Sequence, residues 1–241
     1  MIQEVTTRRM TVGLLWALPL WAMLGAAQAA TPQKIGFVGA GRMGTAIGTL
    51  LVNSGHEVMF SSRHPEEIKP LVDRLGPRAH AGTVAEAVKF GEVVFLTIPY
   101  SGIPDLARDH GAELATKPLV VDVGNPVTRR DGDAGVQVQQ KGLGTYLRET
   151  LPGVKIVRAF NAINWAKLPE YAKRTGANRV AAPMVGDDRR ANALAQQLFR
   201  EIGFEGVLIG GLDKSQFTVP GGALADDHTA PEARRIAKGL K

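Results

Sequence analysis

The chain contains no cysteine among its 241 residues, so disulfides, thiol catalysis and cysteine metal sites are excluded. Aromatic residues are scarce, at 6% of the chain, and no basic tract with interleaved aromatics marks a nucleic-acid-binding segment. The net charge of +6 is spread along the chain. This small excess of positive charge is compatible with a small anionic ligand and does not indicate binding to nucleic acid.

Charged residues are also missing from Met10 to Gln33. This stretch follows Arg8-Arg9, its core from Val12 to Leu24 is strongly apolar, and Ala27-Gln28-Ala29 fits a small-x-small cleavage site. The pattern predicts a signal peptide over residues 1–30, loosely of the twin-arginine type. We therefore expect a periplasmic or exported protein.

Two other interpretations of this segment stay open. An uncleaved anchor would tie the protein to a membrane, although the apolar core is short for a span of about 20 residues and contains Pro19. A misassigned start codon would give a cytoplasmic protein that begins near Thr31. In either case the remaining chain is long enough for one domain with modest additions.

The most informative motif is the run Gly39-Ala40-Gly41-Arg42-Met43-Gly44, which has Gly-x-Gly-x-x-Gly spacing. A β-type stretch over 34–38 precedes it, and apolar residues follow it at helical spacing. Gly39 allows the tight turn, Gly41 lets the backbone approach a pyrophosphate, and Gly44 lets the helix pack closely. The N–H groups at the start of that helix face the phosphates. The motif therefore predicts a dinucleotide-binding site.

The end of the second expected strand favours the phosphorylated cofactor. An NAD site places Asp or Glu there to hydrogen-bond the ribose 2′-hydroxyl. This chain has Ser61, Ser62 and Arg63 instead, with no acid until Glu66. Arg63 can pair with a 2′-phosphate and Ser62 can donate to it, so the residues favour NADP over NAD. The alternative is that Arg63 is a solvated surface residue.

Strand and helix patterns alternate along the chain, which predicts an α/β fold. We expect a doubly wound, mostly parallel sheet of the Rossmann type with a small C-terminal extension. The expected strands are 34–39, 57–61, 78–81, 92–98, 119–123, 154–160, 179–185 and 205–209. The expected helices follow residue 42 and cover 65–75, 83–89, 103–115, 145–151, part of 161–172, 188–202 and a stretch from about 231.

Two segments carry weaker patterns. Residues 124–144 are rich in Gly, Asp and Gln and are predicted to form a long loop. Residues 214–241 are predicted to be a polar C-terminal tail. The expected organisation is thus a signal peptide over 1–30, an NADP-binding domain over 31–213 and this tail.

The chain resembles the F420-dependent NADP reductase family over about residues 34–213. The resemblance rests on a set of landmarks that occur in order: Ile35 to Gly44, Ser61-Ser62-Arg63, Thr97-Ile98-Pro99, Asp122-Val123-Gly124-Asn125-Pro126, Val157-Arg158-Ala159-Phe160-Asn161, Met184 to Asp188 and Gly203-Phe204. Family members often end in an apolar helix that completes the deazaflavin pocket and a dimer contact. This chain ends in a polar, basic helix instead.

The resemblance implies direct hydride transfer between NADPH and a second carrier; it is compatible with a homodimer, and the oligomeric state stays open. It also implies the placing of the cofactor. Ala40, Arg42 and Met43 would line the pyrophosphate; Ser62 and Arg63 would hold the 2′-phosphate; Thr97, Ile98 and Pro99 would border the ribose and nicotinamide; and Ala159, Phe160 and Asn161 would lie nearby.

Two asparagines follow expected strands at the edge where such sheets bind ligands. Asn125 can hydrogen-bond the nicotinamide amide or cap the turn before Pro126, and the residues do not separate these roles. For Asn161 a role in the site is favoured over a turn role.

No catalytic or metal constellation is found in the sequence. The histidines are interpreted as solvated surface residues rather than general bases: His56, His64, His80, His110 and His228. Asp187-Asp188 looks like a metal pair, but a helix N-cap is favoured.

Together these features predict an NADP(H)-dependent oxidoreductase that transfers hydride between NADPH and a flavin-like or deazaflavin (F420-type) acceptor. Hydride transfer needs alignment and exclusion of water rather than a protein nucleophile. A quinone or a small carbonyl compound stays open as the acceptor. The alternatives are a non-catalytic NADP(H)-binding module or sensor subunit, and a small carbonyl or imine reductase, which would need a proton donor near the nicotinamide.

Overall fold

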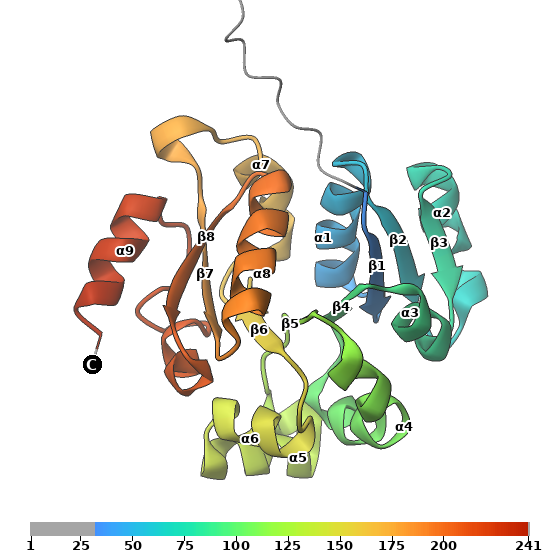
Figure 1. Cartoon of the computed structure of the whole chain (residues 1–241), viewed down its shortest axis with the longest axis horizontal. Helices are drawn as coiled ribbons and strands as arrows, with labels where there is room; N and C mark the ends of the chain where they lie inside the picture. Colours follow the sequence, from blue (N-terminus) through green and yellow to red (C-terminus); the bar gives the residue numbers. More distant parts are fainter. Residues whose placement is uncertain (1–31, 241) are drawn as a thin grey trace, which may run out of the picture. The chain divides into compact units, whose positions relative to one another are not determined.

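Eight strands form one sheet in the order β3-β2-β1-β4-β5-β6-β7-β8 in the computed structural model, which describes residues 32–240 (Figure 1). Every neighbouring pair is parallel except β6 and β7. The strands are β1 (Lys34–Val38), β2 (Glu57–Ser61), β3 (Ala79–Gly82), β4 (Val93–Leu96), β5 (Leu119–Asp122), β6 (Ile156–Ala159), β7 (Ala181–Gly186) and β8 (Glu205–Gly210). The expected doubly wound, mostly parallel Rossmann-type fold is confirmed.

Helices occupy the crossovers between these strands. They are α1 (Arg42–Asn53), α2 (Lys69–Leu75), α3 (Val84–Phe90), α4 (Ile103–Thr116), α5 (Thr128–Lys141), α6 (Leu143–Thr150), α7 (Leu168–Tyr171), α8 (Arg189–Glu201) and α9 (Ala230–Lys238). Short 3-10 turns add η1 (Pro65–Ile68), η2 (Tyr100–Gly102), η3 (Trp165–Lys167), η4 (Gly176–Asn178) and η5 (Leu212–Phe217). A capping box begins α3, because the Thr83 side chain accepts from the Glu86 N–H and the Glu86 carboxylate accepts from the Thr83 N–H.

The sheet is buried on both faces, as a parallel sheet must be. On one face Phe37 of β1 stacks between Phe60 of β2 and Phe95 of β4, with ring centroids 5.5 and 4.8 Å apart. On the other face Val38 and Leu96 join a separate apolar cluster under α4, α5 and α6. Strand order reverses between β1 and β4, and ligands of such sheets bind outside the carboxyl ends of the strands at that point.

The prediction of a long loop over 124–144 was wrong, because α5 occupies most of it. Ala134 and Val138 lie one turn apart and are buried against the second cluster. The Asp131 carboxylate accepts from the Val127 N–H at 2.6 Å and fastens the start of the helix. Gly132 kinks it with φ +52°. Burial of one short apolar stripe thus outweighs the poor helix propensity of Gly and Asp.

The last thirty residues pack on the sheet more closely than a polar tail would. The expected helix near 231 is present as α9, which begins with a Thr229–Glu232 capping box and lies beside β7 and β8 (Figure 1). Leu224 and Ala233 are buried with Val207 of β8 in a third, small cluster. This cluster covers the end of the sheet that is farthest from β1.

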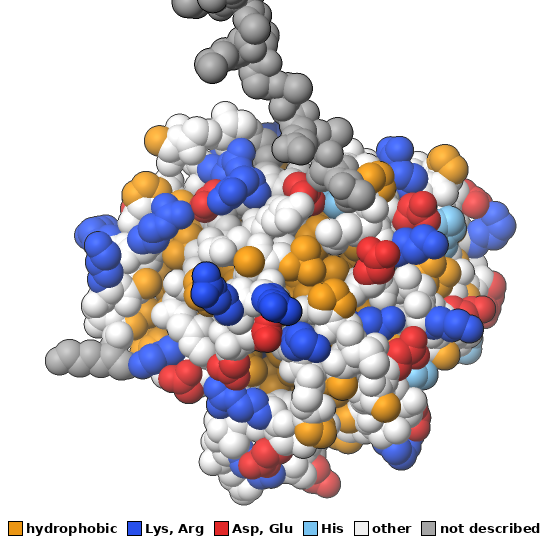
Figure 2. Space-filling view, viewed as in Figure 1, with side chains coloured by type: hydrophobic (Ala, Val, Ile, Leu, Met, Phe, Trp, Pro, Cys, Tyr) orange, Lys and Arg blue, Asp and Glu red, His pale blue; other side chains and the backbone are white. Residues whose placement is uncertain are grey.

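The signal peptide expected over 1–30 lies outside the described residues. Within residues 32–240, none of the helices has the length and apolar character needed to span a bilayer. On the face drawn in Figure 2, Lys and Arg side chains are interspersed with Asp and Glu rather than gathered in one tract.

Candidate dinucleotide-binding site

The glycine-rich turn joins β1 to α1, and its three glycines are required for different reasons. Gly39 has φ +104°, and a Cβ there would lie 2.9 Å from a methyl of Ile98. A Cβ on Gly44 would lie 2.7 Å from the Gly39 carbonyl oxygen. Around Gly41, by contrast, nothing lies within 4 Å of an added Cβ. Packing therefore requires the first and third glycines, whereas the second leaves open space where a ligand can approach the backbone.

The start of α1 is free to receive an anion. Its N-cap is Gly41, which supplies no side-chain cap, and its first turn carries no acidic residue. The first N–H groups of this 12-residue helix thus lack partners within the helix. They carry the positive end of the helix dipole, which makes this turn a candidate site for a phosphate.

Of the three polar side chains at the end of β2, one forms hydrogen bonds within the protein and the other two are available to bind a ligand. Ser61 is buried; its hydroxyl donates to the Phe37 carbonyl at 2.7 Å and accepts from the Gly39 N–H at 3.2 Å. The Ser62 hydroxyl accepts from the His64 N–H at 3.1 Å and keeps its proton to donate. Arg63 is exposed and forms no ion pair with any residue that the structure describes. Its guanidinium is therefore available to a ligand.

One pocket of about 810 Å³ joins these groups across the switch point between β1 and β4. This volume is within the range of small-molecule sites. Of the residues predicted from the sequence, the pocket brings together Gly39, Ala40, Gly41, Ser62, Arg63, Thr97, Ile98 and Pro99. Thr97 also fastens the turn, because its hydroxyl donates to the Gly39 carbonyl at 2.7 Å.

The other seven predicted residues do not line this pocket; three of them are Gly44, in the first turn of α1, and Asn125 and Asn161, which follow β5 and β6. Ala159 and Phe160 are buried in the core, where the Phe160 ring packs edge-on against Phe199 and Phe204. Only their backbone, which has φ +62° at Phe160, is left to face a ligand. Met43 packs on the same core, and the Arg42 guanidinium lies over a tryptophan ring on the other side of α1.

Asn125 and Asn161 hold each other at the carboxyl ends of β5 and β6. The Asn125 amide donates to the Asn161 carbonyl, and the Asn161 amide donates to the Gly124 carbonyl at 2.9 Å. Both side-chain oxygens, by contrast, are buried without a hydrogen-bond partner among the described residues. Two unpaired acceptors thus lie at this edge; both are buried, and neither asparagine lines the pocket.

A buried ionic network beneath these asparagines escaped the sequence interpretation. Arg158 of β6 pairs with Asp122 of β5 and donates to the Tyr100 hydroxyl at 2.6 Å; that hydroxyl donates to Asp122 at 2.7 Å. All three side chains are essentially inaccessible. Burial raises the pKa of Tyr100 well above its usual value, so the hydroxyl stays protonated. The available signal was a charged residue inside each of two buried strand patterns.

The network also fixes the loop that carries Asn125. The second Asp122 oxygen accepts from the Gly124 N–H at 3.0 Å, and Arg158 donates to the Gly124 carbonyl at 3.3 Å. Asp122 and Arg158 are paired in the strand register, which sets their charges side by side. The ion pair therefore positions the end of β5.

The histidine interpretation was wrong for His56. This residue is 1% exposed; its Nδ1 accepts from the Gln33 N–H, and its Nε2 lies 3.0 Å from a Glu201 oxygen. It links the end of α1 to α8 because the turn at Gly55 points it inward. His64, in contrast, is exposed.

The aspartate pair after β7 serves structure, as predicted. Asp188 caps α8 by accepting from the Ala191 N–H at 2.8 Å. Asp187 pairs with Arg148 at 2.7 Å and accepts from the Leu212 N–H. Among residues 32–240 no group of three acidic or histidine side chains is arranged to hold a metal ion.

Comparison with known proteins agrees with this geometry. The rat metalloreductase STEAP3 (Rattus norvegicus) is 31% identical over 183 residues, which cover 74% of this chain and 34% of STEAP3. The chain thus spans about a third of the length of that relative.

Two crystal structures share the fold. The hypothetical protein SMa0349 from Sinorhizobium meliloti has a TM-score of 0.67 and 23% identity, covering 82% of this chain and 95% of its own. A protein from Arthrobacter sp. FB24, named as a candidate F420-dependent NADP reductase, has a TM-score of 0.64 and 22% identity, covering 76% and 87%.

The segment that builds the turn, the end of β2 and the loop after β5 is also the segment that matches a known family. Residues 34–126 fit the family described as NADP oxidoreductase, coenzyme F420-dependent. This nucleotide-binding part of the chain is therefore similar to the family of F420-dependent NADP oxidoreductases, and the match covers 93 of the 241 residues.

Proposed function

We propose that the chain is an NADP(H)-dependent oxidoreductase that transfers hydride between NADPH and a flavin-like or deazaflavin acceptor. The observation that carries the proposal is the single pocket that joins the uncapped start of α1 to Arg63. A dinucleotide with a phosphate on its adenosine ribose matches both ends of it.

The end of β2 supports NADP as the cofactor. Residues 58–65 contain no acid, so no carboxylate of the strand end itself repels a 2′-phosphate, although Glu67 of η1 lines the same pocket. Glu66, the next acid, lies 3.4 Å from the His64 ring. Arg63 and Ser62 then supply a charged and a neutral donor to the phosphate oxygens.

The edge formed by β5 and β6 supports the placing of the nicotinamide. Its carboxamide offers an NH₂ group, and the unpaired oxygens of Asn125 and Asn161 are acceptors for such a donor. Ile98 and Pro99 line the pocket between this edge and the glycine-rich turn. They would exclude water from one face of the ring.

The proposed hydride transfer needs no protein side chain as a nucleophile. The bound cofactor supplies a hydride from its C4 atom, so two electrons and a proton leave NADPH, NADP⁺ remains, and water supplies the second proton of the reduced acceptor. The protein's contribution is distance and orientation. The family name joins NADP with coenzyme F420, and STEAP3 is named a metalloreductase, so both relatives support a reductase.

The test is a titration of the full chain with NADPH and NADH, followed through the fluorescence of the reduced nicotinamide. We expect NADPH to bind at least tenfold more tightly, which corresponds to about 1.4 kcal/mol. Turnover is then measured with FMN, riboflavin and coenzyme F420. Tight NADPH binding without turnover would favour the non-catalytic binding module, and absence of binding would overturn the proposal.

Export is a separate proposal that rests on residues 1–30. We infer that the protein acts outside the cytoplasm, because Arg8-Arg9, the apolar core and the Ala27-Gln28-Ala29 site form a signal pattern. Fractionation of cells that express the full chain would test it. Replacement of Arg8-Arg9 with Lys-Lys should then retain the protein in the cytoplasm, and an unchanged cytoplasmic location of both forms would refute export.

A further inference from the structure

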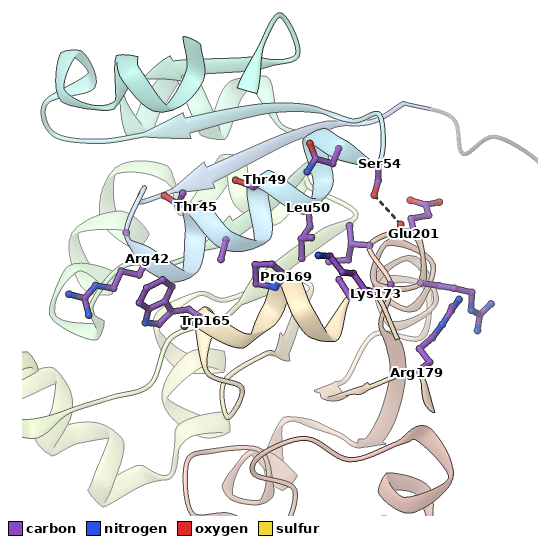
Figure 3. Close-up of a pocket in the computed structure, with 18 of the residues that line it drawn as sticks. Arg42, Thr45, Thr49, Leu50, Ser54, Trp165, Pro169, Lys173, Arg179 and Glu201 are labelled. Atoms are coloured by element: carbon purple, nitrogen blue, oxygen red, sulfur yellow. Dashed lines mark hydrogen bonds between the residues drawn. The ribbon is translucent and has the colours of Figure 1, made fainter. Parts of the chain in front are cut away.

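A second groove, of about 970 Å³, runs along α1, no residue of which lines the dinucleotide pocket. Helix α1 forms one wall, and η3, α7 and the end of α8 form the other (Figure 3). Ala40 and Gly41 line both the groove and the pocket, so the two meet at the glycine-rich turn. The groove then follows α1 for the length of that helix, about 18 Å for 12 residues.

The groove carries positive charge outside the ion pairs of the described residues, although Arg179 is near enough to Glu205 to help lower the pKa of that carboxyl. Arg42, Lys173 and Arg179 line it, and none of them forms an ion pair with another described residue. The carboxylate at its far end, Glu201, is already within 3.0 Å of the His56 ring. Three free cations along one groove attract an anion, and a phosphate pairs with such groups through charge-assisted hydrogen bonds.

The end of the groove next to the glycine-rich turn carries an exposed aromatic ring. Trp165 is 42% exposed, and the Arg42 guanidinium lies 5.4 Å from its ring centroid (Figure 3). The Asn164 side chain accepts from the Ala166 N–H at 2.9 Å and holds this turn in place. Trp165 comes four residues after Asn161, on the loop that leaves the proposed nicotinamide edge. An indole in this position offers a surface for a flat ring.

We propose that this groove binds the hydride acceptor, and that the acceptor is a flat heteroaromatic ring with a phosphate-bearing side chain. The ring lies against Trp165, beside the nicotinamide edge. The phosphate lies farther along α1, between Lys173 and Arg179. This inference rests on the proposed function, because it takes NADPH to occupy the neighbouring pocket.

The experiment uses FMN and riboflavin, which share one ring and differ by the phosphate. The full chain is saturated with NADP⁺ and titrated with each flavin, and the flavin fluorescence is followed. We expect FMN to bind about tenfold or more tightly than riboflavin, the effect of one charged hydrogen bond. Equal affinities, or no binding of either flavin, would overturn the proposal.

Variants locate the phosphate. The double variant Lys173→Ala/Arg179→Ala should lose the preference for FMN and keep its affinity for riboflavin within about twofold. The control Arg235→Ala/Lys238→Ala removes two exposed cations of α9 and should keep the preference. Trp165→Ala should weaken both flavins alike. A preference for FMN that survives in the Lys173/Arg179 variant would also overturn the proposal.

A parallel titration with NADPH separates this inference from the proposed function. If NADPH binds and reduces both flavins with equal ease, the function holds and the groove proposal fails. If FMN binds with the expected preference and NADPH does not bind, the groove is a site for a phosphate-bearing ring, but the proposed function fails and the hydride-acceptor role fails with it.

Discussion

The two ends of the cofactor crevice are built in opposite ways. At the phosphate end the protein offers backbone N–H groups and two surface side chains, and Gly41 faces open space. At the end proposed for the nicotinamide, the loop after β5 is tied to a buried network of Tyr100, Asp122 and Arg158. The first end is left free for the ligand, whereas the second is held by the protein itself.

Because of this difference, we expect mutations at one end to change ligand affinity and mutations at the other end to change folding stability. A free end contributes little to folding, so changes there should act on binding alone. A buried charge that loses its partner keeps its desolvation penalty, so changes in the network should act first on folding. The following predictions test that separation.

The largest effect is expected for Arg158→Met, which leaves Asp122 buried and unpaired. Loss of one partner from a buried pair typically destabilises a protein by about 3–5 kcal/mol. The control Arg148→Met breaks the half-exposed pair with Asp187 and should lose no more than about 1 kcal/mol. Urea unfolding measures both. Similar losses for the two variants would contradict the contrast.

If Arg158→Met does not fold, Tyr100→Phe gives a milder version of the same test. It removes only the hydroxyl that joins Arg158 to Asp122. We expect a loss of about 1–3 kcal/mol, because two buried charged groups each lose one hydrogen bond. A fully stable Tyr100→Phe protein would show that the network is not a structural element.

The next prediction compares the effects of alanine substitution at two glycines of the same turn on stability and on NADPH affinity. The free energy of unfolding of Gly41→Ala should lie within about 0.5 kcal/mol of the wild-type value, because an added Cβ has no described atom within 4 Å. Its NADPH affinity should nevertheless fall at least tenfold, since the methyl occupies the approach of the pyrophosphate. Gly39→Ala should instead lose about 1–3 kcal/mol of stability, because its φ of +104° is strained for alanine. Normal NADPH binding by Gly41→Ala would refute the ligand path.

A smaller effect is expected at the other part of the free end. Arg63→Ala should weaken NADPH binding by about 1–3 kcal/mol, the contribution of a charged hydrogen bond, and leave NADH binding unchanged. Arg74→Ala, an exposed arginine of α2 outside the pocket, is the matched control. Titration with both nucleotides measures the change. Equal losses for NADPH and NADH would remove the 2′-phosphate assignment.

The smallest effect concerns pH and the start of α5. Burial acts to raise the pKa of Asp131, but hydrogen bonds from Arg130 and the Val127 N–H outweigh it, so the pKa lies below its usual value. A lowered folded-state pKa gives stability that is complete above the unfolded-state value, about 3.9, and is lost as the pH falls through the folded-state value. Asp131→Asn should lose about 1 kcal/mol at pH 7.

Unfolding curves of wild type and Asp131→Asn between pH 7 and pH 3 measure this dependence. The two stabilities should converge as the pH falls, because protonation removes the carboxylate from the wild type as well. A gap that stays constant over this range would show that Asp131 does not act through its charge.

Much of the fold was predictable because its causes are local. The glycine spacing, the Thr83–Glu86 capping box and the Asp188 cap each involve residues within one turn of one another. The alternation of strands and helices follows from short apolar runs that must be buried. These features predicted the sheet, the turn and the available groups at its phosphate end.

The remaining features depend on contacts between distant segments. Helix α5 exists because Ala134 and Val138 meet a cluster that other strands provide. His56 is buried because Glu201 lies beside it, 145 residues later in the chain. Phe160 turns into the core because Phe199 and Phe204 receive its ring. No local pattern carries this information.

The sequence by itself determined the fold class and the phosphate end of the site, because glycine spacing, helix starts and the end of β2 act through the nearby backbone. Only the tertiary structure decided the nicotinamide end and the second groove. There the side chains of β4–β6 are brought together by the strand register, and the wall opposite α1 by burial of segments that are distant in the chain. The same contacts pair Arg158 with Asp122, whereas Lys173 forms no ion pair with the described residues.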